Sequence, residues 1–142
     1  MKIIAFLTLG ILLFSCGVKV PVTNQLKEEY DLTEKNMKIV QFYTSQTIIL
    51  QRSKTSGKQG AQDGKLVTSN NSEQDRIIIP SNTKCVFDSY GKDGEVFIRF
   101  ELGANKTLQF AIRDGQTSGK YYLKANWQTG KGGEINYGNE TY

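Results

Sequence analysis

The chain of 142 residues contains no histidine and only two cysteines. Without histidine it cannot assemble a Ser-His-Asp triad or a Cys-His dyad, and it lacks the commonest metal ligand of proteins. The Asp-rich signature of a calcium-binding loop is also missing. We therefore expect neither a nucleophilic hydrolase of the common kinds nor a bound metal, and we expect no cofactor.

The chain also lacks a cluster of basic residues. Its 18 Lys and Arg and 14 Asp and Glu are interspersed along the sequence, and the net charge is +4. A protein that binds nucleic acid concentrates its positive charge on one element, so we expect no nucleic acid partner. No internal repeat or low-complexity tract is present, and the length fits one domain with a single core.

The one long apolar run lies at the N-terminus, where Lys2 precedes an almost wholly apolar stretch over residues 3–14. A charged start followed by an apolar stretch and a small residue describes a secretory signal. As a helix this stretch would span about 18 Å, against about 30 Å for the hydrocarbon of a bilayer. The run is therefore too short for a transmembrane anchor, and Leu13 fits poorly at the site of the general signal peptidase.

The residues that close this run, Leu-Phe-Ser-Cys at 13–16, resemble the lipobox of bacterial lipoproteins. The resemblance implies that residues 1–15 are a signal peptide removed by signal peptidase II. Cys16 would then be the first residue of the mature chain and carry a diacylglycerol and an N-acyl chain. Each buried methylene contributes about 0.8 kcal/mol, so two or three acyl chains anchor a protein firmly to a membrane. Cys85 is then left alone, and no intramolecular disulfide can form.

The residues after Cys16 bear on the location of the lipoprotein. In Gram-negative lipoproteins an Asp directly after the cysteine retains the protein in the inner membrane, and here that residue is Gly17. Some Bacteroidetes lipoproteins reach the cell surface through an acidic patch close behind the cysteine, and residues 17–21 contain no acid. The resemblance thus implies the periplasmic face of the outer membrane, with the lipid anchor as the contact to the membrane.

The mature chain is expected to begin with a tether over residues 16–23, broken by Pro21, and to continue as one domain over residues 24–142. Asn24 is a candidate cap for a short helix that ends near Tyr30. Asp31 is a candidate cap for a second helix over residues 32–38, with Glu34 in the position of a capping box.

From residue 39 onward the pattern is typical of β-structure. Residues 39–50 alternate and are rich in β-branched and aromatic side chains, and their length suggests a bend or two successive strands. Residues 53–64 are polar and rich in glycine, which predicts a loop. Two further strands are expected over residues 65–69 and 75–79, the second ended by Pro80.

Residues 85–90, 95–102 and 108–113 predict a three-stranded meander, with the first turn at residues 91–94. Register follows from the side-chain period of two, because a slip by one residue would turn the apolar side chains to the other face. The pairing that gathers the apolar side chains aligns Tyr90 with Glu95, Phe87 with Ile98, Phe100 with Phe110, and Ile98 with Ile112.

A further strand over residues 120–127 would turn Tyr121 and Trp127 inward, and a glycine-rich turn that includes Gly130 would lead to a last strand at residues 135–137. The sequence therefore predicts a mainly β domain. We expect a small antiparallel barrel or sandwich of seven to eight strands, preceded by a short helical segment.

Candidate catalytic groups are few. Cys85 lies on the expected core face, so we expect its thiol to be buried and unreactive. Asp88, Glu95 and Glu101 lie on the expected outer face of the meander, where they resemble cross-strand surface pairs more than the two acids of a glycosidase. An enzyme that acts on cell-wall glycan with carboxylates alone is the least favoured alternative.

The best candidate for a partner surface is the outer face of the meander. It combines aromatic and charged residues, which are common at protein interfaces: Asp88, Tyr90, Phe97, Arg99 and Arg113. The competing interpretation places Phe97 and Val86 beneath the helical segment.

Together these patterns favour a lipid-anchored, non-catalytic protein of the cell envelope whose β-domain binds another envelope protein. The alternative is a small inhibitor or ligand-binding barrel that acts through residues 53–64, the longest expected loop.

The substitution Cys16→Ala tests the anchor. It removes the thiol that accepts the diacylglycerol, so we expect unprocessed precursor and no label from radioactive palmitate. Normal processing and membrane anchoring of this variant would show that the segment is not a lipobox.

Overall fold

The computed structural model describes residues 17–62, 65–127 and 132–142. The expected signal segment 1–15, the expected lipidation site Cys16 and Gly130 lie outside these residues. Within them the chain forms eleven strands and two short helices, so the domain is mainly β as predicted. Among the described residues, no helix has both the length and the apolar character needed to cross a membrane.

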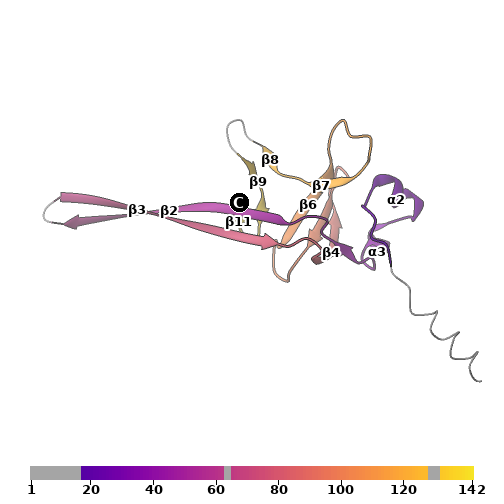
Figure 1. Ribbon diagram of the computed structural model, residues 1–142, viewed down its shortest axis with the longest axis horizontal. Coiled ribbons are helices and arrows are strands. Elements are labelled where there is room, and N and C mark those ends of the chain that lie inside the picture. Colours follow the sequence, from indigo (N-terminus) through magenta and orange to yellow (C-terminus); the bar gives the residue numbers. More distant parts are fainter. Residues whose placement is uncertain (1–16, 63–64, 128–131) are drawn as a thin grey trace, which may run out of the picture.

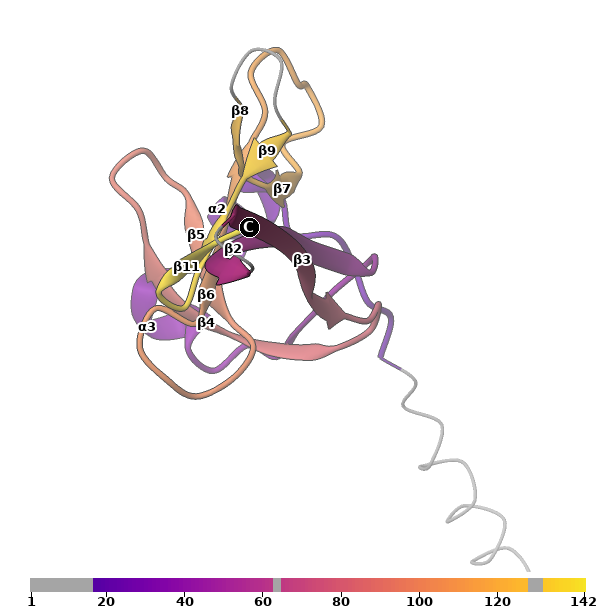
Figure 2. The ribbon, with the colours of Figure 1, turned by 90° about the vertical axis from the view of Figure 1, so that its left-hand side faces the viewer.

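The body of the domain is a five-stranded antiparallel sheet with the order β1-β4-β5-β6-β7. The sheet curls into a half-barrel (Figure 2), which fits the expected small barrel or sandwich. Its strands are β1 (Phe42–Tyr43), β4 (Lys84–Tyr90), β5 (Val96–Arg99), β6 (Thr107–Ile112) and β7 (Tyr121–Leu123).

A long hairpin of β2 (Ile48–Gln62) and β3 (Lys65–Ile79) projects from this body (Figure 1). The expected loop at residues 53–64 is therefore wrong, because residues 53–62 belong to β2. The two strands expected at residues 65–69 and 75–79 are one strand, which ends before Pro80 as predicted. Cross-strand backbone hydrogen bonds hold this polar segment extended although its composition favours a loop.

One sequence signal does mark the hairpin. The outermost pair, Gln62 with Lys65, leaves Asp63 and Gly64 between the two strands. Asp-Gly is a strong signal for a two-residue hairpin turn.

The hairpin continues the ladder that β1 forms with β4. Phe42 pairs with Cys85, and six residues farther along each strand Ile48 pairs with Ile79. The register is thus unchanged across the interruption between the two ladders. The predicted strand at residues 39–50 is two successive strands, β1 and the start of β2, which was one of the expected possibilities.

Thr44 bridges this interruption with both its backbone and its side chain. Its N–H donates to the carbonyl of Thr83 (3.1 Å), and its carbonyl accepts from the N–H of Asn82 (2.7 Å). Its hydroxyl donates to the carbonyl of Pro80 (2.8 Å) and accepts from the N–H of Thr83 (2.9 Å). Because Pro80 and the left-handed Asn82 (φ 65°) interrupt the regular ladder, these four bonds carry the connection from body to hairpin.

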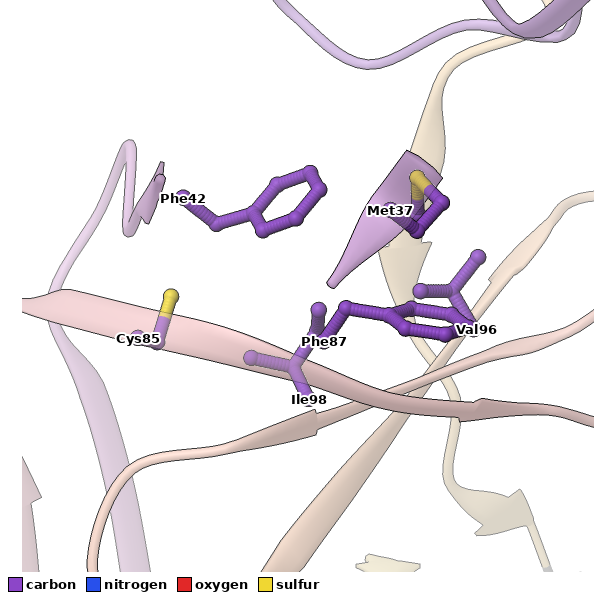
Figure 3. Close-up of a cluster of buried hydrophobic side chains, with 6 residues drawn as sticks. All are labelled: Met37, Phe42, Cys85, Phe87, Val96 and Ile98. Carbon is purple, nitrogen blue, oxygen red and sulfur yellow. The ribbon is translucent and has the colours of Figure 1, made fainter. Parts of the chain in front are cut away.

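The first core cluster packs a side chain of the helical segment against one face of the sheet (Figure 3). Met37 is fully buried there against side chains from β1, β4 and β5. The members are Met37, Phe42, Cys85, Phe87, Val96 and Ile98.

A second cluster joins the base of the hairpin to the C-terminal strands. Leu50 and Ile79 of the hairpin pack there with the fully buried Leu108 of β6 and with Tyr137. Phe100 and Phe110 pack against both clusters, so the two form one continuous core.

The expected helical segment is present, with different caps. Helix α2 (Asn24–Glu29) is capped by Thr23, whose hydroxyl accepts from the N–H of Leu26 (3.1 Å). Helix α3 (Glu34–Met37) is capped by Thr33, and Asp31 has a left-handed backbone (φ 44°) in the turn before it. Asn24 and Asp31 were therefore wrong as caps, since a threonine precedes each helix and satisfies the first-turn N–H groups instead.

The meander keeps its predicted core face up to Phe87, and both of its registers differ from the predicted ones. Phe87 pairs with Ile98 as expected. A bulge between Phe87 and Ser89 then pairs Tyr90 with Val96 and not with Glu95.

Between β5 and β6 the register is four residues from the expected one, since Ile98 pairs with Leu108 and not with Ile112. The connection after Arg99 runs to Lys106 and is longer than expected, with Gly103 (φ 129°) and Asn105 (φ 59°) in backbone conformations that turn the chain. An even shift keeps the side chains of β6 on their predicted faces, which is why Leu108 was still predicted correctly as a core residue.

The C-terminal region forms two small ladders, and the strand expected over residues 120–127 is interrupted after Leu123. β8 (Asn126–Trp127) pairs with β9 (Gly133–Glu134), and β10 (Asn136–Tyr137) pairs with β11 (Glu140–Thr141). Tyr121 packs on the first core as predicted, but Trp127 is 79% exposed and was wrongly placed inside. The cause is that the strand ends after Leu123, so the alternation from Tyr121 does not extend to Trp127.

The substitution Thr44→Val keeps the shape of the side chain and removes its two hydroxyl bonds. We expect a loss of about 1–3 kcal/mol in the free energy of unfolding, since each such bond contributes about 0.5–1.5 kcal/mol. Urea unfolding followed by circular dichroism measures this. The matched control is Thr47→Val, which removes one bond, from the N–H of Ser81 (3.2 Å). An equal effect of the two variants would contradict the role given to Thr44.

Candidate binding sites

The five residues of the expected partner surface do not form one patch. Asp88 and Arg99 form an ion pair across the bulge, with Arg99 Nε 3.1 Å from Asp88 Oδ1 and Nη2 donating to the same oxygen. Both side chains are half-buried. The pair therefore holds the bulged part of β4 against β5, and its charges compensate each other.

Tyr90 lies on the side of the helices and not on the outer face as predicted. Its hydroxyl donates to the carbonyl of Leu32 (2.6 Å), and its ring centroid is 4.8 Å from that of Phe87. The ammonium of Lys27 lies 4.4 Å from the ring centroid. Burial is the main cause that raises the pKa of Tyr90 above its ordinary value. The bulge at Asp88 explains the error, because one extra residue turns the following side chain to the opposite face.

Phe97 and Arg113 occupy two further environments. Phe97 lines a pocket on the outer face of β5. Arg113 follows the end of β6, is exposed, and stacks its guanidinium 4.5 Å from the ring centroid of Tyr122. Val86 is 49% exposed, so the interpretation that placed it beneath the helical segment is wrong. The helices cover the concave face instead.

Glu95 is buried, at 5% exposed, and is not the solvent-exposed surface residue that was expected. Its Oε1 accepts from Lys124 Nζ (2.7 Å), and its Oε2 accepts from the N–H of Asp93 (3.0 Å). These bonds, the one from Lys124 foremost, lower the pKa of Glu95 to about 2. A Cβ added at Gly91 would come 2.3 Å from Oε2, so the glycine makes room for this carboxylate.

Glu101 is exposed and has its own partners. It accepts from the hydroxyl of Tyr137 (2.9 Å) and lies 3.0 Å from Lys106 Nζ. These two contacts lower its pKa, while burial and the nearby carboxylate raise that of Tyr137. Asp88, Glu95 and Glu101 thus each pair with a different cation, and the structure does not bring them together as an acid pair.

Cys85 lies in the first core and is 6% exposed, as predicted. Burial raises the pKa of its thiol to about 11. Thiolates are the reactive form of cysteine, so this environment opposes nucleophilic chemistry. No group of three acidic or cysteine side chains that could hold a metal ion occurs among the described residues.

A pocket of about 350 Å³, which the sequence did not predict, lies between the outer face of β5 and β6 and the C-terminal strands. Phe97 and Thr107 line it from the sheet, and Glu134 and Ile135 from the C-terminal region. Amide side chains make up much of the wall: Asn105, Gln109, Asn126 and Asn136. The residues that line the pocket are far apart in the sequence. The pocket forms because the C-terminal strands lie over the meander.

The base of the hairpin is tied to the C-terminus by Arg52. Its guanidinium donates to Asp75 Oδ2 from Nε (3.0 Å) and from Nη2 (2.8 Å), and it also pairs with Glu140. It stacks 4.9 Å from the ring centroid of Tyr142. Glu140 and Asp75 raise the pKa of Arg52 further above its already high value. One side chain therefore links β2, β3 and β11.

The end of the tether is attached to the body as well. Thr23 bridges to Lys120 beside β7, and the N–H of Asn24 donates to the carbonyl of Gly119 (3.1 Å). Farther toward the N-terminus, Lys19 donates to Asn82 and lies 3.8 Å from the ring centroid of Tyr43. The tether thus reaches the junction at which the hairpin begins.

Acid should destabilise the protein through Glu95. Because its pKa in the folded protein is about 2, below the ordinary 4.5, the stabilisation is complete above pH 4.5 and is lost as the pH falls toward 2. We expect the stability difference between wild type and Glu95→Gln to shrink over this range in urea unfolding curves. Glu29→Gln, an exposed site on α2, is the control. A difference that stays constant from pH 5 to about 2 would contradict the assignment.

Comparison of the chain with protein-family models, with curated proteins and with solved structures finds no match. The chemistry and geometry of the described residues are therefore the basis for assigning a function. Two features stand out for binding, the projecting hairpin and the amide-lined pocket.

Proposed function

We propose that this protein is a lipid-anchored, non-catalytic component of the cell envelope that binds another envelope protein through the hairpin of β2 and β3. Cys16 carries the anchor in this proposal, and the outer membrane, on its periplasmic side, is the location. The observation that carries the binding role is the projection of the hairpin from the body (Figure 1).

The hairpin has the geometry of an arm. Each strand has 15 residues, and a rise of about 3.4 Å per residue gives the arm a length of about 50 Å. Among the described residues, β2 and β3 form regular ladders only with each other. Their outer edges therefore offer backbone N–H and C=O groups to an added strand, which is a common mode of protein recognition.

The start of the described chain lies far from the outer end of the hairpin (Figure 1). The described chain starts beside α3, and the hairpin extends away from that end (Figure 1). Lys19 is held by Asn82 and Tyr43, three residues after Cys16. Three extended residues span at most about 10 Å, so a lipid on Cys16 keeps the body close to the membrane and directs the arm away from it.

The state of the reactive side chains supports binding over catalysis. Cys85 is buried, and Asp88, Glu95 and Glu101 each pair with a separate cation. The pocket wall includes one carboxylate among the described residues, Glu134, whereas glycosidases place two at the scissile bond.

The second candidate is an inhibitor whose projecting segment enters the cleft of an enzyme. The projection itself favours this function, and residues 53–62 would still make the contact, now as the outer part of β2. The two candidate functions differ in the partner, which is an envelope protein in the first and an enzyme in the second. In both, the hairpin makes the contact.

Shortening the hairpin tests both. Deletion of residues 56–62 and 65–71 removes matched pairs and leaves Thr55 and Ser72, which already face each other, on either side of Asp63-Gly64. We expect a folded protein that no longer crosslinks to its partner in the native envelope.

Arg113→Ala is the control, because Arg113 stacks on Tyr122 away from the hairpin, and it should retain the partner. If the shortened protein recovers the same crosslinked protein as wild type, or wild type crosslinks to lipid alone, the proposal is wrong. Circular dichroism and thermal unfolding establish that the shortened chain is folded.

A further inference from the structure

We infer that the pocket between the meander and the C-terminal strands binds a neutral sugar, through one or two pyranose rings. The inference concerns a site separate from the hairpin and does not depend on the protein-binding proposal.

The pocket has a suitable size for such a ligand. Its volume is about 350 Å³, and pockets for small molecules range from about 300 to 1,000 Å³. It is therefore at the small end of that range, which fits one or two sugar units better than a longer chain.

Two amide side chains in the wall are available to a ligand. Within the described part of the chain, Gln109 and Asn126 make no side-chain hydrogen bond, although both line the pocket. The backbone holds them in place: the carbonyl of Gln109 accepts from the N–H of Lys124 (2.8 Å), and Asn126 pairs with Glu134 in the small ladder. Each amide offers donors and an acceptor, which matches hydroxyl groups that both donate and accept.

The other two amides are already oriented. Asn105 Nδ2 donates to Asn139 (3.0 Å), and Asn136 Oδ1 accepts from the hydroxyl of Thr141 (2.8 Å). Each amide keeps unused hydrogen-bonding capacity in these arrangements. A wall of fixed amides lowers the entropic cost of binding a polar ligand.

On the side of the sheet, the pocket wall contains the aromatic ring of Phe97. Phe97 is half-buried in β5 and lines the pocket, and Ile135 lines it from the C-terminal segment. A pyranose has an apolar C–H face as well as polar edges. A ring and an aliphatic side chain among amides therefore complement a sugar better than they complement a small ion.

The charges in the wall favour a neutral ligand. The ammonium of Lys124 is paired with the buried Glu95 (2.7 Å), so its charge is already compensated. Glu134 adds a carboxylate to the wall. An anionic sugar would therefore gain no uncompensated cation from Lys124, and a neutral sugar needs none.

The test uses the full lipidated protein in a detergent without a sugar headgroup. Saturation-transfer NMR and titration calorimetry are performed with maltose, cellobiose, the disaccharide of N-acetylglucosamine, and glucuronate. We expect millimolar binding of at least one neutral disaccharide and at least about tenfold weaker binding of glucuronate, a difference of about 1.4 kcal/mol.

The double variant Gln109→Ala/Asn126→Ala should weaken binding at least about tenfold, since it removes two hydrogen-bonding side chains. Gln25→Ala, on the exposed side of α2, is the matched control and should bind like wild type. If the alanine variant does not fold, Gln109→Met/Asn126→Leu, which keeps the side-chain size and removes the hydrogen-bonding groups, serves in its place with the same expected loss.

The inference is overturned if none of the neutral disaccharides binds at about 20 mM, well above a millimolar Kd. It is equally overturned if the double variant binds as well as wild type, or if glucuronate binds as tightly as the neutral sugars. Shortening the hairpin leaves the pocket intact, so loss of the protein partner and loss of sugar binding can be distinguished.

Discussion

The arrangement of the molecule depends on the junction at Thr44, where one antiparallel ladder is interrupted and resumes in the same register. On one side of it the strands belong to the half-barrel, and on the other they form the projecting hairpin. Four hydrogen bonds from Thr44 cross the interruption. The packing of Leu50 and Ile79 in the second core, and the contacts of Arg52 with the C-terminus, all require the hairpin to leave the body in this direction.

The sequence predicted the faces of the strands better than their partners. Phe87 and Ile98 pair as expected, and a four-residue shift at β6 left the core face unchanged because it is even. The odd shift at the Asp88 bulge reversed Tyr90. The alternation of apolar and polar residues along a strand predicts which side chains face the core. The register between two strands depends on loop lengths and bulges, and the apolar pattern does not predict these.

The candidate sites were harder to predict for a related reason. Asp88 and Arg99 do meet, since they are close across one pair of neighbouring strands. The pocket needs Gln109 of β6 and Asn126 of β8 to face the same space, and no local pattern links them. The hairpin was missed because polar residues were interpreted as a loop, although Asp63-Gly64 is a hairpin turn signal.

The position of Lys19 has a mechanical consequence. It binds Asn82 and Tyr43, and both residues adjoin the junction at Thr44. A force applied to the outer end of the hairpin therefore reaches the N-terminal segment at the junction. The same force also reaches β6 and β11, through the packing of Leu50 and Ile79 on Leu108 and through Arg52, so a pull on the arm is shared between the N-terminal segment and the core of the body.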